Sequence, residues 1–130
     1  MKRQITVIGI LFNCCEPESI TLALEEVKAC SKIHQYLHHP PGATSSEQCS
    51  STSKIFLGAY ANKLTAVDPN WTMANSTEPQ AMREDLPPDG YWKFVNSWND
   101  GDGVQLVGGC CGIGPAHISY LKKNMLLTRD

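Results

Sequence analysis

A chain of 130 residues is long enough for one compact domain. Hydrophobic residues make up 42% of it and charged residues 18%, a balance that excludes a globally disordered protein. The formal net charge of -2 argues against nucleic acid or an anionic membrane as a partner held by bulk electrostatics, and no apolar run is long enough to span a membrane.

The first predicted elements are a strand and a helix. Residues 5–12 (ITVIGILF) form an apolar run without alternation, which is typical of a parallel strand that is covered on both faces. Pro17 suits the first position of a helix. At helical spacing, the apolar residues that follow it fall on one face: Ile20, Ala23, Leu24 and Val27.

Two polar segments flank a second predicted strand. Residues 38–53 are polar, proline-containing and serine-rich, and we expect them to be an exposed loop or a disordered insertion. Residues 55–60 (IFLGAY) form the second apolar run and the second predicted strand. Residues 67–90 contain four prolines and little periodicity, so they are predicted to be a long loop.

The last third of the chain repeats the alternation of helix and strand. Tyr91, Phe94, Val95 and Trp98 have helical spacing, residues 104–107 form a third short apolar run, and Pro115 opens another helix. The order of strands and helices predicts right-handed βαβ units, and therefore an α/β fold with a parallel sheet.

The amino terminus and the cysteine count leave a secreted protein as an alternative. Lys2 and Arg3 precede the apolar run as in a short secretory signal, but no small-residue cleavage site follows. Six cysteines would also allow a disulfide framework. However, four of them form two adjacent pairs, which rarely reach separate partners in a small fold. A reduced, cytoplasmic protein fits this pattern better.

The two cysteine pairs carry the candidate chemistry. Cys14 and Cys15 follow the first predicted strand, and Cys110 and Cys111 follow the third. The carboxyl ends of parallel strands converge on one face of a sheet, so both pairs are expected there. Thiolates form a soft-donor site that zinc commonly occupies, and three of them leave a fourth position open, as catalytic zinc requires.

Other interpretations of these residues remain open. Cysteines at strand ends can be small buried residues, and adjacent cysteines can form a redox-active disulfide. Gly108 and Gly109 lack a Cβ, so the backbone there could pass close to a bound ligand. A phosphate-binding turn is disfavoured because no Lys, Ser or Thr follows in a phosphate-loop spacing.

Three motifs together resemble one enzyme family. Residues 107–112 read VGGCCG and are followed by GPAHI at 114–118. Asn13-Cys14 ends the first predicted strand, and residues 57–62 read LGAYAN. In order and approximate separation, these motifs resemble the Gly-Gly-Cys-Cys, Asn-Cys and Tyr-x-Asn elements of homocysteine S-methyltransferases.

The resemblance implies a fold, a metal and substrates. The fold would be part of a (β/α)8 barrel, with residues 1–130 as its carboxyl-terminal βα units. Zinc would be held by Cys14, Cys110 and Cys111, with Asn13, Tyr60 and Asn62 near the substrate. The thiol of homocysteine would take a methyl group from S-methylmethionine, S-adenosylmethionine or betaine to give methionine.

The sequence departs from the family pattern in two ways. Ile113 stands where the family usually has threonine, which removes a hydroxyl beside the cysteines. A complete barrel needs about twice this length, so the early strands with their Asp-Gly-Gly element are absent. A fragment of the enzyme, able to self-associate and of uncertain activity alone, is therefore expected. A catalytically inactive zinc-binding remnant is the alternative.

Overall fold

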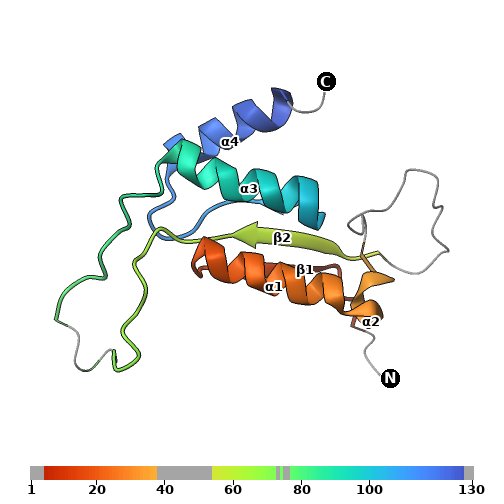
Figure 1. Cartoon of the computed structure of the whole chain (residues 1–130), viewed down its shortest axis with the longest axis horizontal. Coiled ribbons are helices and arrows are strands. Elements are labelled where there is room, and N and C mark those ends of the chain that lie inside the picture. The colour runs from red at the N-terminus through yellow and green to blue at the C-terminus, as the bar shows by residue number, and fades with distance from the viewer. Residues whose placement is uncertain (1–4, 38–53, 73, 75–76, 128–130) are drawn as a thin grey trace.

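The computed structural model describes residues 5–37, 54–72, 74 and 77–127, so the predicted insertion at 38–53 lies outside the described residues. Strands and helices alternate along most of the chain (Figure 1). In chain order the elements are β1 (Gly9–Asn13), α1 (Pro17–Ala29), α2 (Ser31–His34), β2 (Phe56–Tyr60), α3 (Pro88–Asp102), β3 (Leu106–Val107) and α4 (Pro115–Leu127).

The strands form a parallel sheet in the order β1-β2-β3, which confirms the predicted mixed α/β architecture. Gly9 of β1 pairs with Phe56 of β2, and Gly58 of β2 pairs with Leu106 of β3. The strand order follows the chain order without reversal. Helices α1 and α3 both pack into the same hydrophobic core on one face of this sheet.

Helix starts follow the prolines. Pro17 and Pro88 lie in the first turns of α1 and α3, and Pro115 begins α4. A proline is tolerated there because the first backbone N–H groups of a helix have no partner within the helix. Gly103 ends α3 with a left-handed φ of 70° and donates its N–H to the carbonyl of Trp98.

Several predicted boundaries were wrong. The strand expected at residues 5–12 spans Gly9–Asn13, because β2 begins at Phe56, which pairs with Gly9 and leaves residues 5–8 without a register partner in β2. The strand expected at 104–107 is shorter, because Val104 is buried in the turn after α3. The loop expected at 67–90 ends three residues early, because α3 begins at Pro88, and the short helix α2 was not predicted.

The core lies between one face of the sheet and the helices. Leu57 and Ala59 of β2 are buried against residues of α1 and α3, among them Ile20, Tyr91 and Trp98. Burying a large apolar side chain contributes roughly 1.5–3 kcal/mol. The indole Nε1–H of Trp98 donates to the Thr21 hydroxyl at 3.0 Å, so the single polar group of this buried side chain has a hydrogen-bond partner.

The other face of the sheet is not covered within the described residues. Leu11, Phe56 and Leu106 are 46%, 37% and 47% exposed there, although both faces were expected to be covered. Gly58 lies between them, and a Cβ on it would be 3.0 Å from Cγ of Leu11. The described helices include none that is long and apolar enough to cross a membrane.

Candidate metal centre

Three thiols meet where β1 and β3 end. The sulfur of Cys111 lies 3.7 Å from that of Cys14 and 3.8 Å from that of Cys110, and all three sulfurs lie within 4.8 Å of one another. Sulfurs bound tetrahedrally to one zinc ion at about 2.3 Å are separated by about 3.8 Å. The two shorter separations match that value, so the donor set fits zinc in both chemistry and spacing.

The other described cysteines lie outside this cluster. The half-buried side chain of Cys15 packs against the hydrophobic core, and Cys30 lies at the carboxyl end of α1. Cys49 is outside the described residues. None of the described cysteines forms a disulfide, so the structure gives no support to the disulfide framework considered from the sequence.

An unusual backbone conformation presents the Cys14 sulfur. Cys14 has a φ of 51°, and no other described non-glycine residue has a positive φ. This conformation costs about 1 kcal/mol or more, so contacts must hold it in place. The N–H of Cys14 donates to the Tyr60 carbonyl at 3.0 Å, and the Cys14 carbonyl accepts from Nδ2 of Asn62 at 3.0 Å.

Asn62 links the first cysteine turn to the end of β2. Its side chain is 7% exposed; Nδ2 donates to Cys14, and Oδ1 accepts the N–H of Leu64 at 3.0 Å. Its backbone N–H donates to the carbonyl of Cys15 at 3.0 Å. The side chain expected near the substrate therefore already has partners within the chain, and it orients a cysteine.

Asn13 and Tyr60 form a register pair at the ends of β1 and β2. By the alternation of side chains along a strand, Tyr60 shares the uncovered face with Phe56 and Gly58. Asn13 shares it with Leu11, and Asn13 is exposed. Asn13 and Tyr60, two of the three predicted substrate-binding residues, thus lie side by side at the edge of that face nearest the thiols.

The second cysteine turn depends on close packing. The N–H of Cys110 donates to the Ala61 carbonyl at 2.8 Å, and the Cys111 carbonyl accepts from Lys63 at 2.7 Å. A Cβ on Gly109 would lie 2.1 Å from Cγ2 of Ile113. Gly109 therefore leaves room for Ile113, a structural need that is separate from the ligand approach inferred from the sequence.

Two thiols of the cluster, those of Cys14 and Cys110, have pKa values shifted in opposite directions. The interaction between the Cys14 and Cys110 thiols lowers the pKa of Cys14 and raises the pKa of Cys110 to about 11. Burial raises the pKa of the neighbouring Cys15 thiol. Cys14 therefore loses its proton more readily than an isolated thiol does, whereas Cys110 keeps its proton at neutral pH unless a bound cation displaces it.

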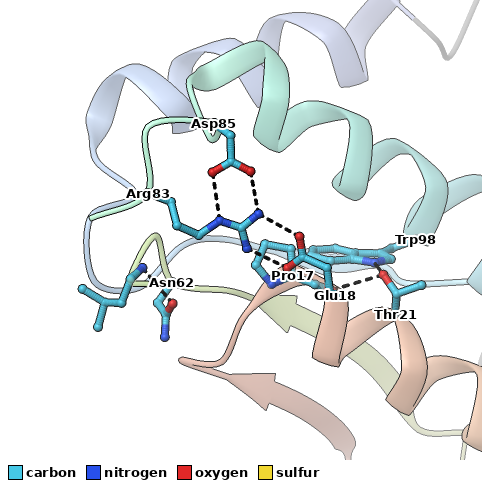
Figure 2. A network of polar contacts seen from close by, with 8 residues as sticks. Pro17, Glu18, Thr21, Asn62, Arg83, Asp85 and Trp98 are labelled. Atoms are coloured by element: carbon cyan, nitrogen blue, oxygen red, sulfur yellow. Dashed lines mark hydrogen bonds and ion pairs between the residues drawn. The ribbon is translucent and has the colours of Figure 1, made fainter. Parts of the chain in front are cut away.

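An arginine clamp that the sequence analysis missed lies beside the site. Figure 2 shows the guanidinium of Arg83 between the carboxylates of Glu18 and Asp85. Arg83 donates to Glu18 at 2.7 and 2.8 Å and to Asp85 at 2.7 and 3.0 Å. Its backbone N–H donates to the carbonyl of Lys63, whose own N–H bonds to Cys111. The clamp therefore connects α1, just after Cys14, to the segment that holds Cys111.

Glu18→Gln removes one carboxylate from the arginine clamp. We expect it to lower the free energy of unfolding by about 0.5–1 kcal/mol, a small loss because water partly screens the ion pair of Glu18 and Arg83. Arg83 lowers the pKa of Glu18, so this stabilisation is present above the unfolded pKa and is lost as pH falls through the folded pKa. Urea unfolding should show the difference from the unsubstituted chain at pH 7, and this difference should shrink as the pH is lowered through the acidic range. Glu25→Gln, at an exposed position of α1, is the control, and equal losses in the two variants would contradict a specific clamp.

Comparison with known proteins identifies a family for this chain. The model of the family homocysteine S-methyltransferase matches residues 1–125. Neither the curated proteins nor the solved structures include a significant match. The family match covers both cysteine turns and β2 between them. The chain therefore belongs to the homocysteine S-methyltransferase family.

Proposed function

We propose that this chain is the carboxyl-terminal part of a zinc-dependent homocysteine S-methyltransferase, with Cys14, Cys110 and Cys111 as the zinc ligands. The observation that carries the proposal is the pair of sulfur separations of 3.7 and 3.8 Å, which suit one tetrahedral ion. Three cysteine ligands would leave one position for a substrate thiol. Cys111 is exposed, so the thiol cluster can be reached from outside.

The uncovered sheet face supports the proposal that residues 1–130 contribute the last βα units of a (β/α)8 barrel. Its strands are in chain order, and the core lies on one face only. In a barrel the opposite face points inward and contacts the remaining strands. Leu11, Phe56 and Leu106 would then be interior side chains. The reduced thiols also fit a cytoplasmic location.

The residues of the chain have distinct roles in this proposal. Zinc, when bound, would supply the Lewis acidity that makes a substrate thiol a better nucleophile at neutral pH. Asn62 holds the Cys14 turn in position. Asn13 and Tyr60, at the edge of the uncovered face, would contact homocysteine or its methyl donor. The substrate thiol loses a proton and gains the methyl group, and the donor's bond from sulfur or nitrogen to that methyl carbon breaks.

Zinc stoichiometry and methyl transfer test the proposal separately. We expect the purified chain to bind one zinc ion, measured by elemental analysis and by competition with a chelator. Homocysteine should then be offered with S-methylmethionine, S-adenosylmethionine or betaine, and methionine measured. Methionine formation that requires Cys110 would support the enzyme. Zinc binding without turnover would favour a binding protein that lacks catalysis, and no zinc binding would refute the site.

A further inference from the structure

The hydroxyl of Tyr91 lies between the ends of β2 and β3. It accepts the N–H of Ala61 at 3.3 Å and donates to the carbonyl of Gly108 at 2.8 Å. In a regular parallel ladder the N–H of Ala61 would donate directly to Gly108, just as the N–H of Gly108 donates to Ala59 at 3.1 Å. The hydroxyl therefore occupies the place of one direct hydrogen bond between the strands.

Ala61 and Gly108, the two residues that bond to this hydroxyl, are each followed closely by a residue of the thiol site. Ala61 precedes Asn62, which fixes the Cys14 turn, and its carbonyl accepts the N–H of Cys110 at 2.8 Å. Gly108 is two residues before Cys110. We infer that Tyr91 is a positioning residue whose hydroxyl sets the spacing between the two cysteine turns. The consequence of this spacing for zinc binding rests on the function proposed above.

The hydroxyl can be separated from the packing role of the ring. Tyr91 is fully buried, and its ring makes edge contacts with Trp98 and His117 at centroid distances of 6.2 Å each. Phenylalanine would keep these contacts and remove only the oxygen. Ala61 and Gly108 would then bond directly, which draws the strands together, or they would lose their partner. Either result moves Cys110 relative to Cys14.

The test compares Tyr91→Phe with a control that loses a half-buried hydroxyl with the same number of hydrogen bonds. The Thr21 hydroxyl also makes one donated and one accepted bond, to the Pro17 carbonyl and from the Trp98 indole. Thr21→Val removes both bonds without touching β2 or β3. In the full chain, Tyr91→Phe should raise the Kd for Zn²⁺ and Co²⁺ by about tenfold or more, the usual cost of losing a residue that supports a metal site. Thr21→Val should leave both values within about twofold.

A second measurement needs no metal. Cys14 and Cys111 sulfurs lie 3.7 Å apart, so diamide should join them in a disulfide that mass spectrometry can map. We expect this disulfide to form several-fold more slowly in Tyr91→Phe and at the normal rate in Thr21→Val. A change in either measurement that is confined to Tyr91→Phe supports the inference.

Two results would overturn it. In one, Tyr91→Phe leaves both the metal affinity and the disulfide rate unchanged. In the other, the two variants change equally, which would make Tyr91 an ordinary core residue. Failure of the unsubstituted chain to bind zinc is a distinguishable outcome: it would refute the proposed metal site, while the disulfide rates would still decide the role of Tyr91.

Discussion

Replacing Cys110 with serine should abolish tight zinc binding, with a loss of affinity on the order of a thousandfold, because a neutral hydroxyl is a poor ligand for zinc compared with a thiolate. Cys14→Ser and Cys111→Ser should have effects of similar size, since all three sulfurs lie within 4.8 Å of one another. The measurement is competition with a chelator of known affinity. The far-ultraviolet circular dichroism of each variant shows whether its helices remain.

Cysteines outside the cluster supply matched controls. Cys30→Ser changes a half-buried thiol at the end of α1, and Cys15→Ala changes the residue next to a proposed ligand. Both should keep one zinc ion per chain with little change in affinity. If Cys15→Ala loses zinc while Cys14→Ser retains it, the proposed ligand at the end of β1 is wrong.

The same site should bind zinc more tightly as pH rises. Thiols must lose their protons to become ligands, and the pKa of Cys110 is raised to about 11, so zinc competes with protons at neutral pH. The apparent Kd should fall by about tenfold per pH unit for each proton released, between about pH 6 and pH 8. An affinity independent of pH over this interval would contradict thiol ligands.

Much of the fold could be predicted from local signals. Apolar runs marked the three strands, and Pro17 and Pro115 marked the starts of two helices. The boundaries depended on partners that the local sequence does not reveal. β1 starts at Gly9 because β2 begins opposite it, and Val104 was lost from β3 because the turn after α3 buries it.

The convergence of the cysteine pairs could be predicted because topology alone brings the ends of parallel strands together. The supporting contacts could not. Asn62 bonds to a residue 48 positions away, Arg83 to one 65 positions away, and Tyr91 reaches a carbonyl 17 positions ahead. Such pairs leave no periodic pattern in the sequence, so the motifs suggested substrate contact for Asn62, a place on a helix face for Tyr91 and no role for Arg83.

Gly109→Ala should destabilise the chain strongly, by about 2–4 kcal/mol, through steric overlap in the second cysteine turn. A Cβ there would lie 2.1 Å from Cγ2 and 2.5 Å from Cβ of Ile113, which is 8% exposed and part of the core. These atoms are too close to the backbone of Ile113 to move away alone, so the turn itself must shift. Zinc affinity should fall with stability, because Cys110 and Cys111 lie between the two residues.

The adjacent glycine is the control for this substitution. A Cβ on Gly108 would meet only Cβ of Tyr60, at 3.5 Å, which is ordinary van der Waals contact. Gly108→Ala should therefore cost less than about 1 kcal/mol. In an Ile113→Gly background both overlapping atoms are absent, so adding Gly109→Ala should cost little more, and urea unfolding of the four chains gives the coupling free energy. Equal costs for Gly109→Ala with and without Ile113 would show that some other contact requires the glycine.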